Sequence, residues 1–280
     1  MVLTGVKMNN GTAAPRPPES CARSQESGAR ALILDDHVWR APSAHPALGE
    51  DEVHVWRIAL EPPPSRVARL ERLLDTPERR RALRYRFPED RRRFIVTRGV
   101  LRSLLGAYLG ADPGALTFRY GRHGKPALAG SPLASALRFN VAHSHELALI
   151  AVARRRTLGV DLEYLRPIDH ERLAARVLGA RERAAFDALA EHARRRAFFD
   201  AWTRKEAFLK ATGQGLSRPL RRLDLAPTTD GLQIIHAGAR HWALRELHPG
   251  PGYTGALAVQ GQGGRLVCWR WSWHPRGTGS

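Results

Sequence analysis

The chain has 280 residues, of which 43% are hydrophobic, so it is long enough for one or two domains with a substantial core. It carries 45 basic against 27 acidic residues, and this net charge of +18 favours polyanionic partners such as nucleic acid, acidic protein surfaces or phosphate-rich small molecules. The two cysteines, Cys21 and Cys268, lie far apart and argue against a disulfide framework. No stretch approaches the roughly 18 apolar residues of a membrane span, and no signal-peptide core precedes Asp35. We therefore expect a cytoplasmic protein with no membrane partner.

The first half of the chain alternates between strand and helix patterns. Residues 1–48 are rich in Gly, Pro, Ser, Ala and Asn and predict a flexible extension. Alternating β-formers predict a strand over 53–60, and leucines at helical spacing predict a helix over 65–85. A second helix is expected from Pro88 to Leu109, followed by strands over 116–120, 138–142 and 147–152.

The second half repeats this alternation after the connector Arg154-Arg155-Arg156. It predicts a strand over 158–163, and then helices over 168–177, 180–191 and 193–212, the last ending at Gly213. Further strands are expected over 221–226, 231–236, 241–247, 253–260 and 265–273. We therefore predict an α+β protein of two similar lobes, with an extension over 1–48, an N-terminal lobe over 49–156, a C-terminal lobe over 157–273 and a tail over 274–280.

Two acidic residues on one predicted strand give the first chemical signal. Asp161 and Glu163 are two positions apart, so their side chains lie on the same face, with Leu162 on the other. Two adjacent carboxylates repel each other unless a cation lies between them, and Mg²⁺ prefers oxygen ligands of this kind. The alternative is a strand leaving the core with two solvated acids.

The helix predicted over 193–212 gives the second signal. Trp202, Glu206 and Lys210 follow one stripe at intervals of four residues. Glu206 and Lys210 alone would be an ordinary surface pair. The aromatic residues around them indicate a helix that packs closely, so the pair reaches a cleft, with Lys205 at the edge of that cleft.

Basic and polar residues at predicted strand and loop ends complete the pattern. His143 and Ser144 follow a strand end, where side chains commonly line clefts. Lys125 lies on a stiffened Gly-Lys-Pro loop, and Arg93 and Arg98 carry guanidinium groups suited to bidentate phosphate contacts.

In order and spacing, these motifs resemble the 4′-phosphopantetheinyl transferases, specifically the two-lobed surfactin-synthetase-activating type. The resemblance covers about residues 53–260 and is carried by an arginine-bearing helix, a Gly-Lys-Pro loop, Phe-Asn-x-x-His-Ser, Gly-Val-Asp-x-Glu and Trp-x-x-Lys-Glu-Ala-x-x-Lys. It implies a pseudo-dimer of two α/β lobes with the active site in the cleft between them. It also implies magnesium-dependent transfer of phosphopantetheine from coenzyme A to a serine of an apo carrier protein, by a monomer that needs no nucleic acid.

The resemblance also assigns roles to residues. Asp161, Glu163 and Glu206 match the magnesium-binding acids, and Asp161, Glu206 and Lys210 are the expected catalytic residues. The residues expected to contact coenzyme A are Arg93, Lys125, His143, Ser144, Lys205 and Lys210. A carboxylate, Glu206 or Glu182, or a metal-bound water is expected to take the serine proton.

The sequence departs from the family pattern at one position, and it also suits two other functions. Ala142 stands where many family members have serine, so a hydroxyl contact to phosphate is lost at that position. The three acids also suit another magnesium-dependent phosphoryl-transfer enzyme or a nuclease. The net charge suits a polyanion-binding protein, whose binding would depend steeply on salt.

Overall fold

The computed structural model describes residues 32–34, 38–121, 124–130, 132–215, 219–225, 232–237, 240–261 and 264–273. Within these ranges the strands are β1 (Leu32–Leu34), β2 (Glu52–Ala59), β3 (Phe118–Tyr120), β4 (Pro126–Leu128), β5 (Leu137–Ser144), β6 (Leu147–Arg154), β7 (Leu158–Tyr164), β8 (Leu232–Ala237), β9 (Arg240–Leu247), β10 (Tyr253–Gln260) and β11 (Gly264–Arg270). The helices are α1 (Pro64–Glu71), α2 (Thr76–Leu83), α3 (Pro88–Leu109), α4 (Pro132–Ala136), α5 (His170–Val177), α6 (Ala180–Asp187) and α7 (Glu191–Thr212), with 3-10 turns η1 (Pro113–Ala115) and η3 (Leu220–Arg222).

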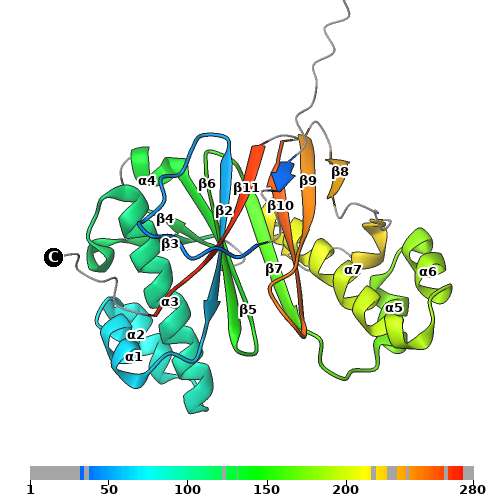
Figure 1. Ribbon diagram of the computed structural model, residues 1–280, viewed down its shortest axis with the longest axis horizontal. Helices are drawn as coiled ribbons and strands as arrows, with labels where there is room; N and C mark the ends of the chain where they lie inside the picture. Colours follow the sequence, from blue (N-terminus) through cyan, green and yellow to red (C-terminus); the bar gives the residue numbers. More distant parts are fainter. Residues whose placement is uncertain are drawn as a thin grey trace, which may run out of the picture.

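Two sheets lie face to face between helices, as Figure 1 shows. The first has the strand order β1-β11-β2-β6-β5, and the second has the order β7-β10-β9-β8. Helices α1, α2 and α3 cover the outer side of the first sheet, while α7 covers the second and carries α5 and α6 at its far end. The strands β3 and β4 form a separate two-stranded ribbon. This mixed α+β architecture is the predicted one.

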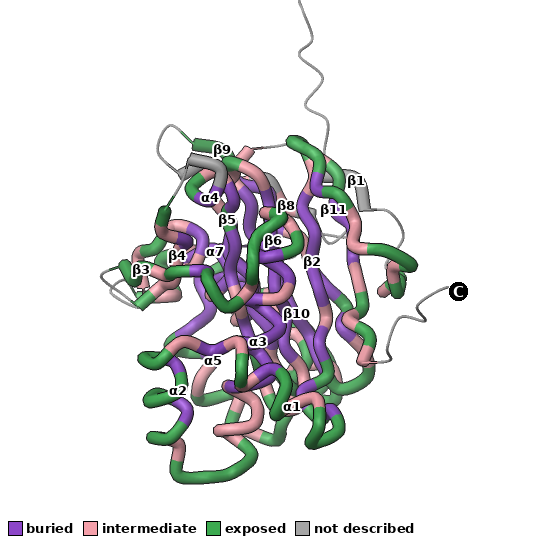
Figure 2. Tube along the Cα trace, turned by 90° about the vertical axis from the view of Figure 1, so that its left-hand side faces the viewer, coloured by how far each residue is buried: buried purple, intermediate pink, exposed green. Residues whose placement is uncertain are grey.

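The alternation of side chains along β2 explains why the first sheet is covered on both faces. Trp56 and Ile58 pack into a core with α1 and α3, whereas Val53 and Val55 pack into a second core shared with β7, β9 and β10. Because both faces are apolar, the central strands are buried throughout, as the purple tube in Figure 2 shows. Hydrogen bonds link β5 and β7 at the edges of the two sheets, among them one from the Val160 backbone N–H to Asn140 Oδ1 at 2.8 Å.

The helix α3 has its expected bounds, and α7 ends at its expected residue but begins at Glu191, two residues before the expected start. Pro88 occupies the first turn of α3, where a missing N–H costs nothing. Gly110 follows α3 with a φ of 62°, and Gly213 follows α7 with a φ of 69°. Both glycines adopt the left-handed conformation that ends a helix.

Two predicted elements differ from the observed ones. The helix expected over 65–85 is divided into α1 and α2, because the Asp75 carboxylate accepts a hydrogen bond from Glu78 N at 2.9 Å and starts a new helix. The strand expected over 221–226 is wrong, since residues 220–222 form the turn η3 and residue 226 lies outside the described residues.

The chain termini also differ from expectation. Within the expected extension, β1 pairs in parallel with β11, and Leu48 is buried. Residues 1–31, 35–37 and 274–280, and with them Cys21, lie outside the described residues. The last strand, β11, pairs with β2 and β1 in the first sheet. The expected C-terminal lobe, residues 157–273, included β11, but this strand belongs to the first sheet. Residue 157 lies in the connection from β6 of the first sheet to β7 of the second.

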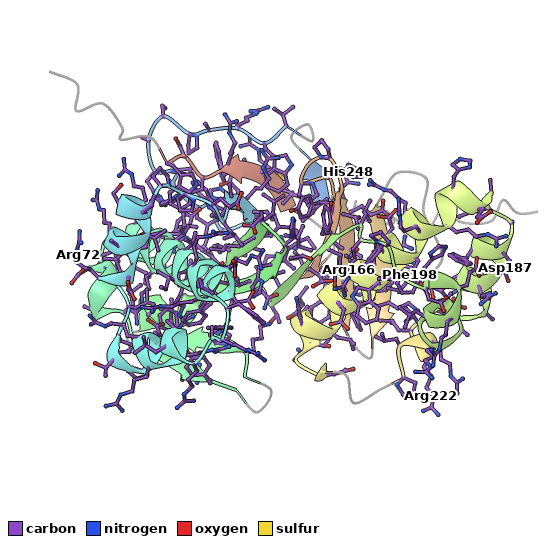
Figure 3. The ribbon with its side chains drawn as sticks, turned by 90° about the horizontal axis from the view of Figure 1, so that it is seen from below. Arg72, Arg166, Asp187, Phe198, Arg222 and His248 are labelled. Carbon is purple, nitrogen blue, oxygen red and sulfur yellow. The ribbon has the colours of Figure 1, made fainter. Side chains whose placement is uncertain are left out.

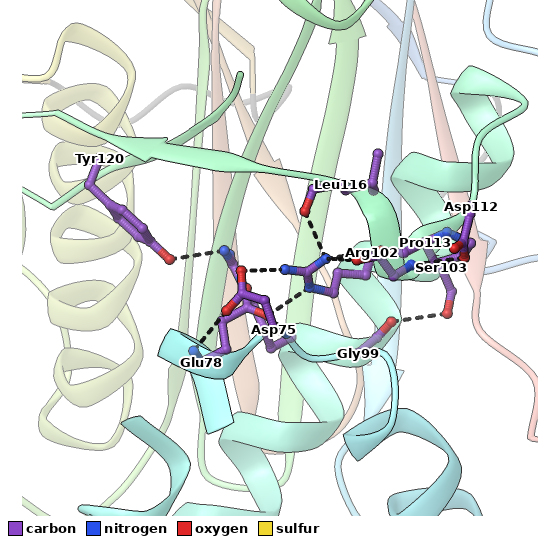
Figure 4. Close-up of polar contacts among 11 residues, drawn as sticks. Asp75, Glu78, Gly99, Arg102, Ser103, Asp112, Pro113, Leu116 and Tyr120 are labelled. Carbon is purple, nitrogen blue, oxygen red and sulfur yellow. Dashed lines mark hydrogen bonds and ion pairs between the residues drawn. The ribbon is translucent and has the colours of Figure 1, made fainter. Parts of the chain in front are cut away.

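A buried group of charged side chains fixes α2 against α3 (Figure 4). Glu78 accepts hydrogen bonds from Arg98 and from Arg102, the latter at 2.6 Å. Arg102 also donates to Asp75 at 2.7 Å and to the Leu116 carbonyl at 2.9 Å. Because every charge in this group has a partner, its role is to hold the helices together.

The surface of the molecule is charged at both ends. Figure 3 shows Arg72 at the α1 end and Arg222 at the α6 end, both exposed, with Phe198 enclosed among the helices of the second end. None of the described helices is both long enough and apolar enough to cross a membrane.

Candidate active site

The site begins on β7, which carries both acids of the Gly-Val-Asp-Leu-Glu motif. Val160 and Leu162 pack between the two sheets, so Asp161 and Glu163 lie on the opposite face, toward α7. Asp161 is only 5% exposed. A carboxylate at such a depth needs cationic or hydrogen-bonding partners.

Gly159 lets α7 approach this strand closely. A Cβ atom at this position would lie 2.2 Å from the Ala207 carbonyl oxygen and 2.4 Å from the Ala211 backbone nitrogen. Only glycine permits this contact, and it brings the last turns of α7, with Glu206 and Lys210, over the acids of β7. Sequence reasoning missed this role of Gly159.

The two acidic motifs meet through an ion pair. The Lys210 ammonium donates to Asp161 Oδ1 at 2.6 Å. Asp161 Oδ2 and Glu206 Oε1 are both buried, and neither has a hydrogen-bond partner among the described residues. Buried oxygens without partners are rare and costly, so their presence calls for an explanation.

The carboxylates of the site interact electrostatically. Burial raises the pKa of Asp161, while the charge of Lys210 lowers it. Burial also raises the pKa of Glu163 and of Glu206, and the charge of Asp161 raises both further. The three acids therefore lie close enough to one another to interact electrostatically.

The donor chemistry of this environment fits a hard divalent cation. In the described ranges, no three His, Cys, Asp or Glu side chains lie close enough to form a ready metal site. However, Mg²⁺ commonly takes only one or two carboxylates and completes its shell with water and phosphate oxygens. Asp161 Oδ2 and Glu206 Oε1 are free to serve in this way, and a cation there would relieve the repulsion.

His143 and Ser144 are the last two residues of β5, rather than residues beyond its end. Ser144 Oγ donates to Glu163 Oε2 at 3.2 Å and accepts from the Tyr164 backbone N–H at 3.0 Å. Desolvation and the nearby charges of Lys210 and Arg93 lower the pKa of His143. The end of β5 therefore lies beside both the acids and the basic residues.

Lys125 lines a cavity of about 550 Å³, which we call the Lys125 cavity. Its ammonium donates to the Lys210 carbonyl at 2.7 Å and to the Leu158 carbonyl at 3.0 Å. Burial and the charges of Arg138 and Lys210 lower its pKa to about 8. The cavity is lined by Arg119, Tyr120, Gly121, Lys125, Pro126, Ala127, Leu137, Arg138, Phe139, Thr157, Leu158 and Gly213.

Arg119 and Arg138 are cavity residues that sequence reasoning missed. They lie on β3 and β5, on either side of the Gly-Lys-Pro loop. Arg119 lies two residues before Gly121, and Arg138 lies two residues before Asn140. This closeness to the Gly-Lys-Pro and Phe-Asn-x-x-His-Ser motifs is the signal that could have identified them.

Arg93 lies on α3 and belongs to a partly exposed network. Its guanidinium bonds Asp90 at 3.0 Å and Glu146 at 3.1 Å, and the bond to Glu146 raises its pKa. Arg93 is close enough to His143 to influence its pKa. Its contact with coenzyme A remains a prediction.

Two predicted basic residues do not join the others. Arg98 is 8% exposed and is held by Glu78 and Tyr120, so it is not free to bind phosphate. Lys205 is fully buried, pairs with Glu182 at 2.6 Å and donates to the Val177 carbonyl at 2.6 Å. Lys205 is on a different side of α7 from Glu206 and Lys210, and its side chain points into the core between α5 and α7. This placement contradicts its expected contact with coenzyme A.

Comparison with known proteins agrees with this geometry. The sequence pattern of the 4′-phosphopantetheinyl transferase superfamily matches residues 157–258, and that of the 4′-phosphopantetheinyl transferase N-terminal region matches residues 59–155. The chain is 43% identical to the 4′-phosphopantetheinyl transferase HetI of Nostoc sp. over 237 residues, which are 84% of this chain and 99% of HetI. The chain belongs to the 4′-phosphopantetheinyl transferase superfamily.

More distant members of the family match over a smaller share of the chain. The transferase Sfp of Bacillus subtilis is 28% identical over 187 residues, or 66% of this chain and 81% of Sfp. The transferase psf-1 of Bacillus pumilus is 30% identical over 184 residues, or 63% of this chain and 76% of psf-1. The chain is therefore a phosphopantetheinyl transferase, and the nuclease and polyanion-binding alternatives lose their support.

Proposed function

We propose that the protein transfers the 4′-phosphopantetheine group from coenzyme A to a serine hydroxyl of an apo acyl or peptidyl carrier protein. The reaction would depend on Mg²⁺ and release adenosine 3′,5′-bisphosphate. The observation that carries this proposal is the pair of buried, unpartnered oxygens on Asp161 and Glu206 beside Lys210. Such a centre is built for a cation and phosphate oxygens, and it lies next to a cavity lined by basic residues.

The metal ion would be held by Asp161, Glu163 and Glu206. When bound, Mg²⁺ supplies positive charge to the pyrophosphate oxygens. Glu163 is aligned for this role by its hydrogen bond from Ser144. Asp161 is aligned by Lys210, whose ammonium lies on the other carboxylate oxygen.

The basic residues would hold coenzyme A. Lys125 and Arg138 line the same cavity, so they are placed to contact its phosphates, with Phe139 available to pack against the base. His143 and Arg93, at the end of β5 and on α3, would bind the phosphates nearer to the acids. This fixed charge orients the β-phosphorus without reorganisation during the reaction.

The reaction joins the carrier serine oxygen to the β-phosphorus and breaks the bond from that phosphorus to the bridging oxygen. Lys210 would stabilise the charge that develops on the leaving phosphate. Glu206 is the proposed acceptor of the serine proton, through the carboxylate oxygen that does not hold the cation. Glu182 is a poorer candidate, since its Oε2 already pairs with Lys205 and accepts from the Gly179 N–H.

The carrier is expected to meet the arginine-rich region over 174–196, which suits an acidic protein surface. We further propose a cytoplasmic monomer without nucleic-acid or membrane partners, because one chain supplies both sides of the site.

The test is a transfer assay with an apo carrier protein, coenzyme A and Mg²⁺, followed by intact mass spectrometry of the carrier. Wild-type protein should add one phosphopantetheine, and EDTA should prevent the addition. Asp161→Asn should slow transfer by at least about a thousandfold, the scale of removing a group that organises transition-state charge. The matched control Asp112→Asn alters an exposed helix-capping acid and should keep full activity. Substantial transfer by Asp161→Asn at saturating Mg²⁺ would remove the basis for the proposed centre.

A further inference from the structure

A second cavity, of about 560 Å³, lies at the ends of β2 and β6 and beside the turn between β9 and β10. It is named here the Arg57 cavity. Its lining residues are Arg57, Ala59, Glu61, Glu146, Leu147, Pro249, Gly250, Pro251, Tyr253, Arg270, Trp271, Ser272 and Trp273. It shares no lining residue with the Lys125 cavity and contains neither the three acids nor Lys210.

Arg57 on β2 and Arg270 on β11 are register partners in the first sheet, and both line the Arg57 cavity. Arg57 donates to the Pro249 carbonyl and lies over the Trp39 ring, with its Cζ 5.6 Å from the ring centre. Burial and the charge of Arg270 lower the pKa of Arg57. Within the described ranges, neither guanidinium has an ion pair, and no hydrogen bond is found for the Arg270 side chain.

The acids that line the cavity are already neutralised. Glu61 pairs with Arg92 at 3.3 Å, and Glu146 pairs with Arg92 at 3.3 Å and with Arg93. Among the described residues, the guanidinium groups of Arg57 and Arg270 therefore have no carboxylate paired with them.

The aromatic wall of the cavity also has unused donors. Trp271 and Trp273 pack edge to face with ring centres 6.1 Å apart. The indole N–H groups of both are buried and have no hydrogen-bond partner among the described residues. Both rings line the cavity, so they can contact a flat apolar group.

We propose that the Arg57 cavity binds a small organic anion, with a carboxylate or phosphate head on Arg57 and Arg270 and a flat apolar body against Trp271 and Trp273. The volume lies within the roughly 300–1,000 Å³ range of small-molecule pockets. Two adjacent guanidinium groups match the oxygens of such a head, and tryptophan and proline walls match an apolar body. This inference does not depend on the proposed transfer chemistry.

The test measures binding of naphthalene-2-carboxylate and 2-naphthyl phosphate by isothermal titration calorimetry in the presence of saturating coenzyme A. The two probes distinguish a carboxylate head from a phosphate head, and naphthalene-2-carboxamide is the neutral control. Arg270→Gln should weaken binding of the anions about tenfold or more, the scale of one charge-assisted hydrogen bond. Arg265→Gln removes the same charge from the other end of β11 and should bind like wild type.

Arg270→Gln is the principal variant because no contact of its side chain within the described ranges holds the fold. It should transfer phosphopantetheine at the wild-type rate, so this result separates the cavity from the catalytic centre. The proposal is overturned if neither anion binds up to about 10 mM, well above ordinary small-ligand affinities. Equal affinity for the neutral carboxamide, or equal losses in Arg270→Gln and Arg265→Gln, would also overturn it.

Discussion

Two buried groups of acidic and basic side chains, one in each half of the chain, differ in how fully their polar atoms are paired. In the first half, both oxygens of Glu78 are bonded to arginines, and Arg102 is bonded on every side (Figure 4). In the second half, Asp161 and Glu206 each keep one buried oxygen without a partner. The same residue types therefore stabilise the fold in one place and leave room for ligands in the other.

This comparison predicts opposite effects of removing a single negative charge. Glu78→Gln should lower the free energy of unfolding by about 3–5 kcal/mol, because it removes the charge shared by two buried arginines and leaves Arg98 without a carboxylate partner. Glu206→Gln should cause no such loss, because burial and the charges of Asp161 and Glu163 disfavour the Glu206 carboxylate in the folded protein. Urea unfolding of both variants measures the difference. Equal destabilisation would mean that the two groups do not differ in the proposed way.

Gly159→Ala should break the close contact on which the second group depends. The added Cβ would collide with the α7 backbone, which cannot move like a flexible side chain. We expect a loss of about 1–3 kcal/mol in stability and about a hundredfold in transfer rate, because Glu206 and Lys210 shift relative to Asp161. Gly114→Ala is the control, since its nearest contact would be an ordinary 3.6 Å. Wild-type activity in Gly159→Ala would show that the approach of α7 tolerates adjustment.

The smallest expected effect is a pH dependence at Lys125. Its pKa in the folded protein is lowered to about 8, so the ammonium is charged below that pH and loses its proton above it. The value of kcat/KM for coenzyme A should therefore fall as pH rises through about 8, by roughly tenfold for one lost phosphate contact. Lys125→Gln should have a lower value that no longer falls in this range. A parallel fall in both proteins would assign the titration to another group.

Much of the site was predictable because its residues are set by local periodicity. The spacing of Asp161 and Glu163 on a strand, and of Glu206 and Lys210 on a helix, placed each pair on one face. The helix α3 has the expected bounds and α7 ends where expected, because Pro88 begins α3 and Gly110 and Gly213 follow the two helices; α7 begins two residues earlier than expected, at Glu191.

The features that failed depend on partners distant in sequence. Arg98 and Lys205 looked available, but Glu78 and Glu182 pair with them across the fold. The close approach at Gly159 depends on the position of α7. The division between α1 and α2 is an exception, because it depends on the local capping box of Asp75 and Glu78. None of these contacts leaves a periodic signal in the sequence.

The position of β11 affects how the protein folds during its synthesis. This strand lies between β1 and β2, and Arg265 contacts Glu52 across 213 residues of sequence. A ribosome must therefore deliver the chain through residue 270 before the first sheet can be completed, and contacts so distant in sequence form slowly. Until then, the edge of β2 is open to other chains, so the nascent protein depends on its last strand for protection against aggregation.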